Sequence, residues 1–260
     1  MNKIIQGNCV DVMATFPDNY IDLTVTSPPY DNLRDYSGYD FDFEGIANQL
    51  YRITKQGGVV VWVVGDATIK GSETGTSFRE ALYFKDIGFN LHDTMIWQKP
   101  GFSAVGALST RYAPVFEYMF ILTKGKLKTF NPIRDRKNKT KGTISGTIMN
   151  VDGTRRRMSN EGKNRREYGQ RFNIWEITQV TVNDDHPAMF PEQLASDHII
   201  SWSNEGDLIL DSMCGSGTTC KKAMANNRKY IGIDISEEYC EIARKRIAEH
   251  QQQLTFEAIT

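Results

Sequence analysis

A glycine-rich turn in the last quarter of the chain could bind a nucleoside. It begins at Asp211, after a short apolar run, and contains Gly215 and Gly217 before a helix that we expect to extend to about Asn226. The two glycines can adopt positive φ and let a ligand approach the backbone closely, while the start of the helix presents unpaired N–H groups. About 20 residues later Asp234 ends the next apolar run, where its carboxylate can accept hydrogen bonds from both hydroxyls of a ribose. The pair predicts a site for an adenosine-containing cofactor.

The composition of this turn distinguishes between two such cofactors. A dinucleotide fingerprint needs a third glycine, and Cys220 stands at that place. The carboxylate of Asp211 would repel a pyrophosphate, but it could hold the cationic amino end of a methionine-like group. The turn therefore favours S-adenosylmethionine over NAD.

A second motif, Thr26-Ser27-Pro28-Pro29-Tyr30, could activate an amine. The prolines lack N–H donors, so the backbone at these positions offers only acceptors. An exocyclic amine of a nucleobase is a poor nucleophile because its lone pair is delocalised into the ring. The Ser27 hydroxyl and the Pro28 carbonyl could accept its two N–H groups and localise that lone pair for attack on a sulfonium methyl, with Tyr30 stacked on the base. Pro-Pro-Tyr alone is equally typical of a rigid loop.

A sheet flanked by helices is the scaffold that would position these motifs. Apolar or β-branched runs predict strands at 4–6, 21–26, 59–64, 208–210 and 230–233, with an antiparallel pair at 95–99 and 117–123. Helical spacing predicts helices over 43–53, 191–202 and 237–247 and a shorter one before Gly88. We expect the shorter helix to cover a sheet face with Phe78, Ala81 and Leu82. The alternation predicts a doubly wound, mostly parallel α/β sheet with ligands at the carboxyl ends of its strands.

The net charge of −1 hides a strong local asymmetry. Residues 124–171 hold 15 Lys or Arg against 4 Asp or Glu, a balance of +11, so the remainder carries −12. A cationic block in an otherwise acidic protein predicts a surface for a polyanion such as a nucleic acid, and a solvated loop is the alternative. We expect one domain, with 1–123 as its catalytic part, 124–173 as a basic insertion and 174–260 as its cofactor-binding part.

The remaining composition indicates a cytoplasmic protein without a metal. The four cysteines are scattered without a C-x-x-C pair, which predicts reduced, mostly buried thiols rather than disulfides or a zinc site. The longest apolar run, 59–64, is too short to span a bilayer, and residues 1–13 lack the apolar stretch of a secretory signal.

The motifs together resemble those of DNA amino-methyltransferases of the permuted, so-called beta group, in which the catalytic motif precedes the cofactor motif. Residues 26–30 are similar to that family's Ser-Pro-Pro-Tyr tetrad, and 211–219 to its cofactor loop. Residues 232–239 are similar to its ribose-binding segment, 186–194 to the segment against the methionine part, and 7–11 to the one near the adenine. The resemblance covers nearly the whole chain. It implies a Rossmann-like methyltransferase fold, in which the basic block is the target-recognition region on double-stranded DNA.

The resemblance also implies roles for individual residues. The catalytic residues would be Ser27, Pro28, Pro29 and Tyr30. The cofactor would be bound by Gly7, Asn8, Cys9, Asp11, Phe190, Glu192, Asp211, Met213, Cys214, Gly215, Ser216, Gly217, Thr218, Thr219 and Asp234. The basic residues facing DNA would be Arg134, Arg136, Lys137, Arg155, Arg156, Arg157, Arg165 and Arg166. Ser212 and Met213 replace the usual Pro and Phe, and Asn8 replaces an Asp, so the role of Asn8 is open.

The target base follows from the residue before the two prolines. In the resembled family Ser at this place is associated mainly with N4-cytosine enzymes, and Asp or Asn mainly with N6-adenine enzymes. Ser27 therefore favours cytosine, and adenine is the alternative because both bases present an amine beside a ring-nitrogen acceptor. An RNA or protein-amide methyltransferase and an idle DNA-binding module are further alternatives. The sequence leaves open whether a restriction endonuclease accompanies the enzyme.

Overall fold

The computed structural model describes residues 1–29, 41–101, 110–180 and 191–257. For residues 254–257 it describes the backbone only. Tyr30 and Phe190, two residues with expected roles, lie outside the described residues. The chain forms two compact units. The larger contains Met1–Asn131 and Asn173–Thr260, and the smaller contains Pro132–Phe172.

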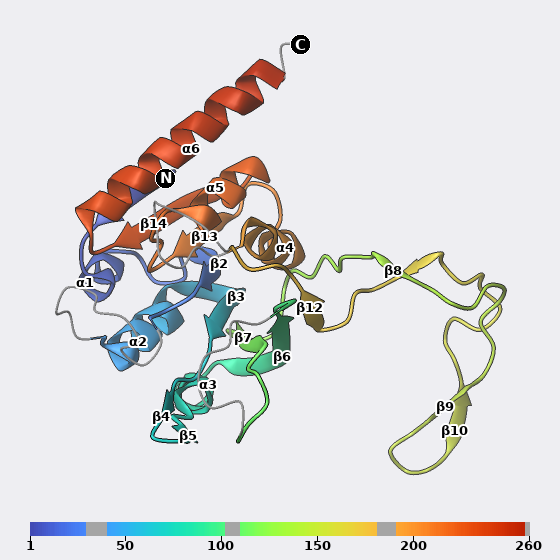
Figure 1. Ribbon diagram of the computed structural model, residues 1–260. Coiled ribbons are helices and arrows are strands. Elements are labelled where there is room, and N and C mark those ends of the chain that lie inside the picture. The colour runs from blue at the N-terminus through green and yellow to red at the C-terminus, as the bar shows by residue number, and fades with distance from the viewer. Residues whose placement is uncertain (30–40, 102–109, 181–190, 258–260) are drawn as a thin grey trace. The chain divides into compact units, whose positions relative to one another are not determined.

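An eight-stranded sheet forms the centre of the larger unit (Figure 1). Its order is β1-β14-β13-β2-β3-β7-β6-β12, and β7 is antiparallel to both of its neighbours whereas the other pairs are parallel. The strands are β1 (Lys3–Gln6), β2 (Ile21–Thr26), β3 (Thr54–Val64), β6 (Asn90–Gln98), β7 (Phe116–Thr123), β12 (Ile174–Glu176), β13 (Leu208–Asp211) and β14 (Lys229–Asp234). A short hairpin, β4 (Thr68–Ile69) and β5 (Ser72–Glu73), stands apart from the sheet. The predicted mostly parallel sheet is confirmed.

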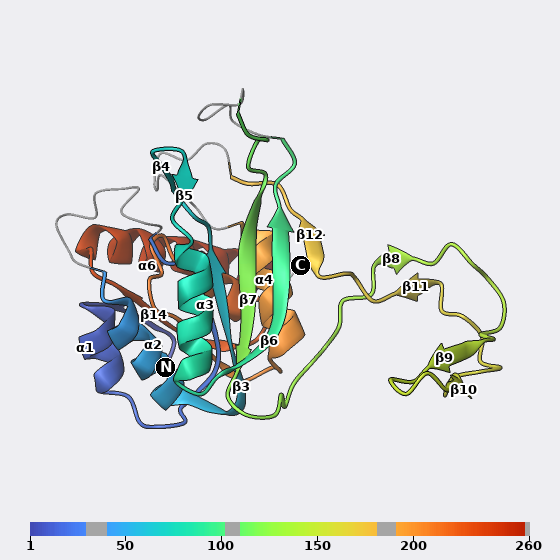
Figure 2. The ribbon, with the colours of Figure 1, turned by 90° about the horizontal axis from the view of Figure 1, so that it is seen from below.

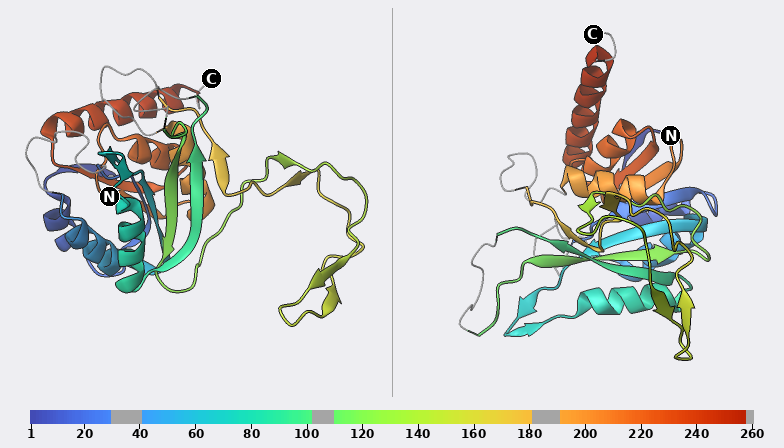
Figure 3. Two further views of the ribbon diagram at one scale, coloured as in Figure 1. Left: turned by 60° about the horizontal axis from the view of Figure 1, so that its bottom comes forward. Right: turned by 90° about the vertical axis from the view of Figure 1, so that its right-hand side faces the viewer.

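In the described part of the chain, three helices cover each face of this sheet (Figures 1 and 2). One face carries α1 (Cys9–Ala14), α2 (Phe43–Ile53) and α3 (Thr76–Asp86), and the other carries α4 (Glu192–Trp202), α5 (Thr218–Ala225) and α6 (Glu237–Glu257). Each face buries its own apolar cluster, as a doubly wound sheet requires. Figure 3 shows that the C-terminal part of α6 extends beyond the sheet. Among the described residues, no helix combines the length and apolarity needed to cross a bilayer.

The buried face of α3 differs in part from the prediction, because Ala81 is buried as expected but the other two residues are not. Phe78 and Leu82 are 50% and 58% exposed, and the helix turns Glu80 and Phe84 inward instead. Polar contacts account for this rotation, because the buried Glu80 carboxylate accepts the indole N–H of Trp62 at 2.7 Å. This pairing gives the buried indole N–H and the buried carboxylate a hydrogen-bond partner, which buried polar groups require.

Within the main sheet and its covering helices, α1 and β12 were not predicted, and the start of α4 differs from the prediction. The six-residue α1 and the three-residue β12 are too short to produce a periodic pattern. Pro191 precedes α4 as its N-cap in an extended conformation and does not occupy the first helical turn.

The smaller unit is a ribbon in which the first half of the segment pairs antiparallel with the second half. At its base the N–H of Arg171 donates to the carbonyl of Ile133 at 2.9 Å, and further along Arg165 donates to Gly142 at 2.8 Å. The paired segments are β8 (Arg136–Lys137) with β11 (Tyr168–Gly169) and β9 (Thr147–Met149) with β10 (Arg155–Arg157). We call residues 132–172 the basic ribbon, and they hold 12 Lys or Arg against 4 Asp or Glu.

Candidate active site

The sheet topology brings the proline motif and the glycine turn together. β2 and β13 are parallel neighbours, so Ser27 follows one strand at the same edge at which Ser212 follows the other. Thr26 joins them directly: its hydroxyl donates to Oδ1 of Asp211 at 2.9 Å and accepts from the Ser212 hydroxyl at 3.3 Å. This link spans 185 residues of sequence, and no local pattern indicates it.

Asp211 is a carboxylate buried at the end of β13, where it is 6% exposed. Besides the Thr26 hydroxyl, its Oδ1 accepts the N–H of Met213 at 3.3 Å. Burial raises the pKa of Asp211 from 3.8 to about 6, against the lowering effect of these hydrogen bonds. A buried carboxylate of this kind fits a cationic partner, because a bound ammonium would compensate the cost of its charge.

The glycine turn has the conformation that its sequence predicts. Gly215 and Gly217 have φ of +47° and +79°, and the N–H of Gly215 donates to Oδ2 of Asp234 at 2.8 Å. The other oxygen of Asp234 accepts the N–H of Ser236 at 3.0 Å. A carboxylate can accept several hydrogen bonds, so the role of Asp234 in fixing the turn is compatible with binding ribose hydroxyls.

Gly217 is required for a second reason besides its positive φ. A Cβ at this position would lie 2.7 Å from the Cβ of Ala243 on α6. The absent side chain therefore makes room for α6 against the turn. Thr218 and Thr219 follow in the buried first turn of α5, and the Thr219 hydroxyl donates to the carbonyl of Val25 on β2 at 3.3 Å.

The end of β1 lies beside the end of β14. The N–H of Gly7 donates to the carbonyl of Asp234 at 2.9 Å. Asn8 is the N-cap of α1, and its side-chain oxygen accepts the N–H groups of Val10 at 2.8 Å and Asp11 at 3.5 Å. The structure thus gives Asn8 a capping role, which the sequence left open. Cys9 and Asp11 follow in this six-residue helix.

A cluster of charges supports the glycine turn from the side of α6. Arg246 donates to the carbonyl and the hydroxyl of Ser216 at 2.7 and 2.6 Å, and it lies 3.7 Å from Glu192 at the start of α4. Glu192 also pairs with Lys221 at 2.6 Å and with Lys222 at 3.5 Å; burial would raise its pKa, but these two cations hold it below the usual value. Arg246 therefore links two segments with expected cofactor roles, and no sequence signal singled it out.

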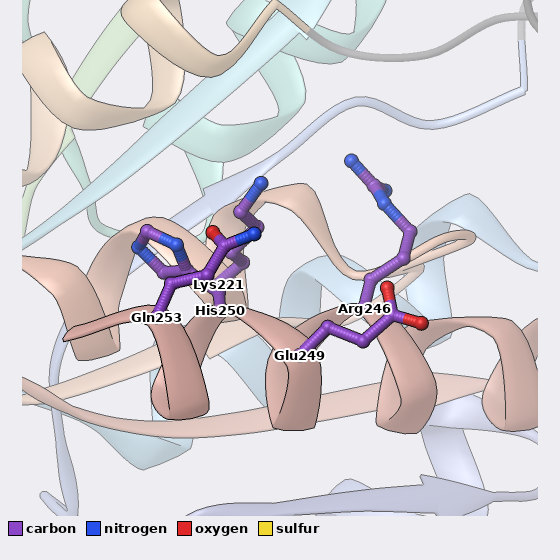
Figure 4. A pocket seen from close by; sticks show the side chains of 5 residues that line it. All are labelled: Lys221, Arg246, Glu249, His250 and Gln253. Atoms are coloured by element: carbon purple, nitrogen blue, oxygen red, sulfur yellow. The ribbon is translucent and has the colours of Figure 1, made fainter. Parts of the chain in front are cut away.

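A small polar pocket adjoins this cluster (Figure 4). Lys221 of α5 and four residues of α6 line it, namely Arg246, Glu249, His250 and Gln253. Figure 4 shows these side chains projecting from the two helices. Arg246 is the member that also contacts the turn, so the pocket lies on the supporting side of the site.

Burial makes most of the cysteine thiols unreactive. Cys214, Cys220 and Cys240 are buried, and Cys9 is half-buried. Burial raises the pKa of Cys9 and of Cys240 to about 11, and that of Cys214 and Cys220 well above its usual value. None of these thiols is activated for attack on a base carbon. Among the described residues, no group of three or more His, Cys, Asp or Glu could hold a metal ion.

The structure places the residues expected to face DNA along the basic ribbon. Arg136 and Lys137 form β8, Arg155, Arg156 and Arg157 form β10, and Arg165 lies between the paired segments. Arg136 stacks on Phe172 with 4.5 Å from its guanidinium carbon to the ring centroid. Arg134 and Arg166 flank the β8–β11 pair in sequence.

A family model described as DNA methylase matches residues 21–245 of this chain. The chain belongs to this family. The orphan methyltransferase M.BamHII of Bacillus amyloliquefaciens is 57% identical to this methylase over 240 residues, which are 88% of this chain and 89% of that protein. Both findings confirm the predicted family.

Two solved structures share the fold of this methylase. The PvuII DNA methyltransferase (cytosine-N4-specific) is 18% identical with a TM-score of 0.67, covering 96% of this chain and 91% of that one. M1.HpyAVI in complex with SAM is 19% identical with a TM-score of 0.64, covering 94% and 98%. The methylase is therefore an S-adenosylmethionine-dependent DNA methyltransferase with the predicted fold and cofactor. The turn, Asp211 and Asp234 are chemically suited to that cofactor.

Proposed function

We propose that this methylase transfers a methyl group to the N4 amine of cytosine, in a base rotated out of a DNA duplex. When bound, S-adenosylmethionine supplies the electrophilic methyl group. Cytosine is favoured because the residue before the two prolines is Ser. The observation that carries methylation of an amine is the position of Ser27. It directly follows Thr26, whose hydroxyl is bonded to Asp211, so an amine held at Ser27 would lie beside the residues suited to the cofactor.

The task of Ser27 and Pro28 is to hold the amine. We propose that the Ser27 hydroxyl and the Pro28 carbonyl accept its two N–H groups, which localises the nitrogen lone pair. The proton displaced after methylation can pass to water, so no dedicated base is required. The amine of a paired base is buried in the duplex, and extrusion costs a few kcal/mol, which stacking on Tyr30 would offset.

Asp211 and Asp234 would hold the two ends of the cofactor, and Glu192 would adjoin it. We propose that Asp234 binds the ribose and Asp211 the amino end of the methionine part. Gly7, Asn8, Cys9 and Asp11 would adjoin the adenine, and the turn from Met213 to Thr219 would contact the methionine part with Phe190. The hydrogen bond from the N–H of Gly7 to the carbonyl of Asp234 supports a common binding site at this edge of the sheet.

The deciding experiment identifies the methylated nucleoside. Unmethylated genomic DNA is incubated with the protein and labelled cofactor, and the nucleosides are analysed by mass spectrometry. We expect label in N4-methylcytosine. Label in N6-methyladenine alone would overturn the assignment of cytosine as the target base and leave the amine chemistry intact. Label at the cytosine ring carbon would overturn the amine chemistry, because that reaction needs a reactive cysteine and the thiols are buried.

Two variants test the roles of the proline motif. Ser27→Ala removes one acceptor for the amine and Tyr30→Ala removes the stacking surface, so both should lower kcat more than they weaken cofactor binding. Calorimetry with S-adenosylmethionine supplies the comparison. An unchanged kcat in Ser27→Ala would exclude the hydroxyl from holding the amine.

A further inference from the structure

A chain of hydrogen bonds at the tip of the basic ribbon ends on one arginine. The tip is the turn from Asn150 to Thr154 between β9 and β10. Oδ1 of Asp152 accepts both the N–H and the hydroxyl of Thr154, at 2.9 and 2.6 Å. The Asn150 amide donates to the Thr154 hydroxyl oxygen at 2.9 Å, and its carbonyl oxygen accepts Nε of Arg156 at 3.1 Å.

Each bond in this chain fixes the direction of the next. The Thr154 hydrogen bonds hold the pKa of Asp152 below its usual value, so the carboxylate is ionised near neutral pH. An ionised carboxylate is acceptor-only, so the Thr154 hydroxyl must donate to it and offers its lone pair to Asn150. The amide of Asn150 then has to present its oxygen to Arg156. Linked bonds of this kind polarise and orient one another.

The three consecutive arginines of β10 differ in what holds them. Arg157 is 83% exposed and lies 3.5 Å from Glu161. Side chains alternate along a strand, so Arg156 projects from the face opposite to Arg155 and Arg157. Among the described residues, no carboxylate lies within ion-pair distance of Arg156, so its charge is not neutralised locally. Asn150 occupies its Nε, and the two terminal nitrogens make no hydrogen bond that is seen among the described residues.

We infer that Arg156 reads a guanine of the recognised DNA word, whereas Arg155 and Arg157 contact phosphates. The inference rests on the proposed action on duplex DNA and names the residue that selects the site. A two-stranded ribbon fits the major groove, where the planar fork of an arginine matches the O6 and N7 acceptors of guanine. An arginine whose Nε is already held loses less conformational freedom when it binds a base edge.

The test compares three substitutions that keep the positive charge. The word recognised by the wild-type protein is first mapped by methylation of a random duplex library and sequencing. Arg156→Lys keeps the charge but loses the fork. We expect it to lower the preference for one guanine position at least tenfold, with the salt dependence of binding unchanged. Arg155→Lys and Arg157→Lys are the matched controls and should keep the word.

A fourth variant tests the hydrogen-bonded chain itself. Asn150→Ala leaves Arg156 in place but removes the group that holds Nε, so it should weaken discrimination at the same guanine position and at no other. Retention of the full word by Arg156→Lys, or an equal loss in all three lysine variants, would overturn the inference. A wild-type protein that methylates no DNA would overturn the proposed function, and this result appears before any variant is compared.

Discussion

Asp211 is the residue at which stability and binding oppose one another. Its pKa in the folded protein, about 6, lies above the ordinary value of 3.8, so the proton is bound more tightly in the folded state. The stability that this proton contributes is fully present below pH 3.8 and is lost as the pH rises through about 6. Near neutral pH the protein without cofactor therefore bears the cost of a buried carboxylate.

The pH dependence of cofactor binding should follow this group. As the pH falls from 7 to 5, Asp211 is protonated and no longer attracts an ammonium. The affinity for S-adenosylmethionine should then weaken, approaching about tenfold per pH unit below the pKa. Isothermal titration calorimetry across this range measures it, and a flat profile would remove Asp211 from the cofactor site.

The matched variant is Asp211→Asn, whose amide oxygen can still accept from Thr26. Without cofactor it should raise the free energy of unfolding at pH 7.5 by about 1 to 3 kcal/mol, because the buried charge is gone. Its cofactor affinity should be low and independent of pH between 5 and 7. Urea unfolding with and without cofactor gives both quantities.

At the scale of elements, the contact between the glycine turn and α6 leaves no room for a side chain at Gly217. Gly217→Ala combines positive φ with a clash against Ala243, and it should lower the free energy of unfolding by about 2 kcal/mol or more. Gly206→Ala is the control, because Gly206 has φ of +83° and an added Cβ there would meet no atom within 4 Å. It should cost less.

A second substitution separates strain from clash. In Gly217→Ala combined with Ala243→Gly the contact between the two Cβ atoms disappears and a tight contact of 3.1 Å with the Cα of residue 243 remains. The loss should therefore be smaller than the sum of the two single losses. Additive losses in urea unfolding would mean that α6 does not press on the turn.

Arg246 carries the other contact between α6 and the turn. Arg246→Met removes its bonds to Ser216, and we expect KM for S-adenosylmethionine to rise about tenfold while the Kd for DNA is unchanged. Arg246→Lys should restore part of the loss, because a cation remains near Glu192. Lys245→Met, which changes the exposed neighbour, should have no effect. An equal loss of cofactor and DNA binding would indicate general unfolding instead of a positioning role.

The elements that could be predicted are those with a long pattern. Val59 to Val64 is a continuous apolar run, and α2 repeats its apolar residues at helical spacing, so both were clear in the sequence. The prediction of the buried face of α3 was wrong at Phe78 and Leu82. That face depends on the pairing of Glu80 with a residue of another element, Trp62. The same limit applies to the site: the glycine turn is local, whereas Thr26 meets Asp211, and Arg246 meets Ser216, only after folding.

At the scale of the whole molecule, the basic ribbon should provide DNA affinity and leave cofactor binding alone. Replacing Arg155, Arg156 and Arg157 together by Ala should reduce the slope of log affinity against log salt by about 2, since two of the three are assigned to phosphates. Fluorescence anisotropy in a salt series measures the slope. An unaltered slope would place the DNA elsewhere.

Excision of the ribbon is the corresponding control. Ile133 and Arg171 are hydrogen-bonded at its base, so a short glycine linker can replace residues 134–170 without separating these ends. The shortened protein should bind S-adenosylmethionine like the full chain and lose DNA affinity. Loss of cofactor binding as well would show that the larger unit depends on the ribbon.

The rate at which the buried thiols react with a reagent measures how often the folded protein opens. Cys214, Cys220 and Cys240 are sealed within the half of the sheet that would hold the cofactor, and their raised pKa values keep them as thiols. An alkylating reagent can therefore mark them only in molecules whose strands have transiently parted. The alkylation rate therefore reports these opening events without an introduced label. Saturating cofactor should lower the alkylation rate by the factor that corresponds to the free energy of cofactor binding.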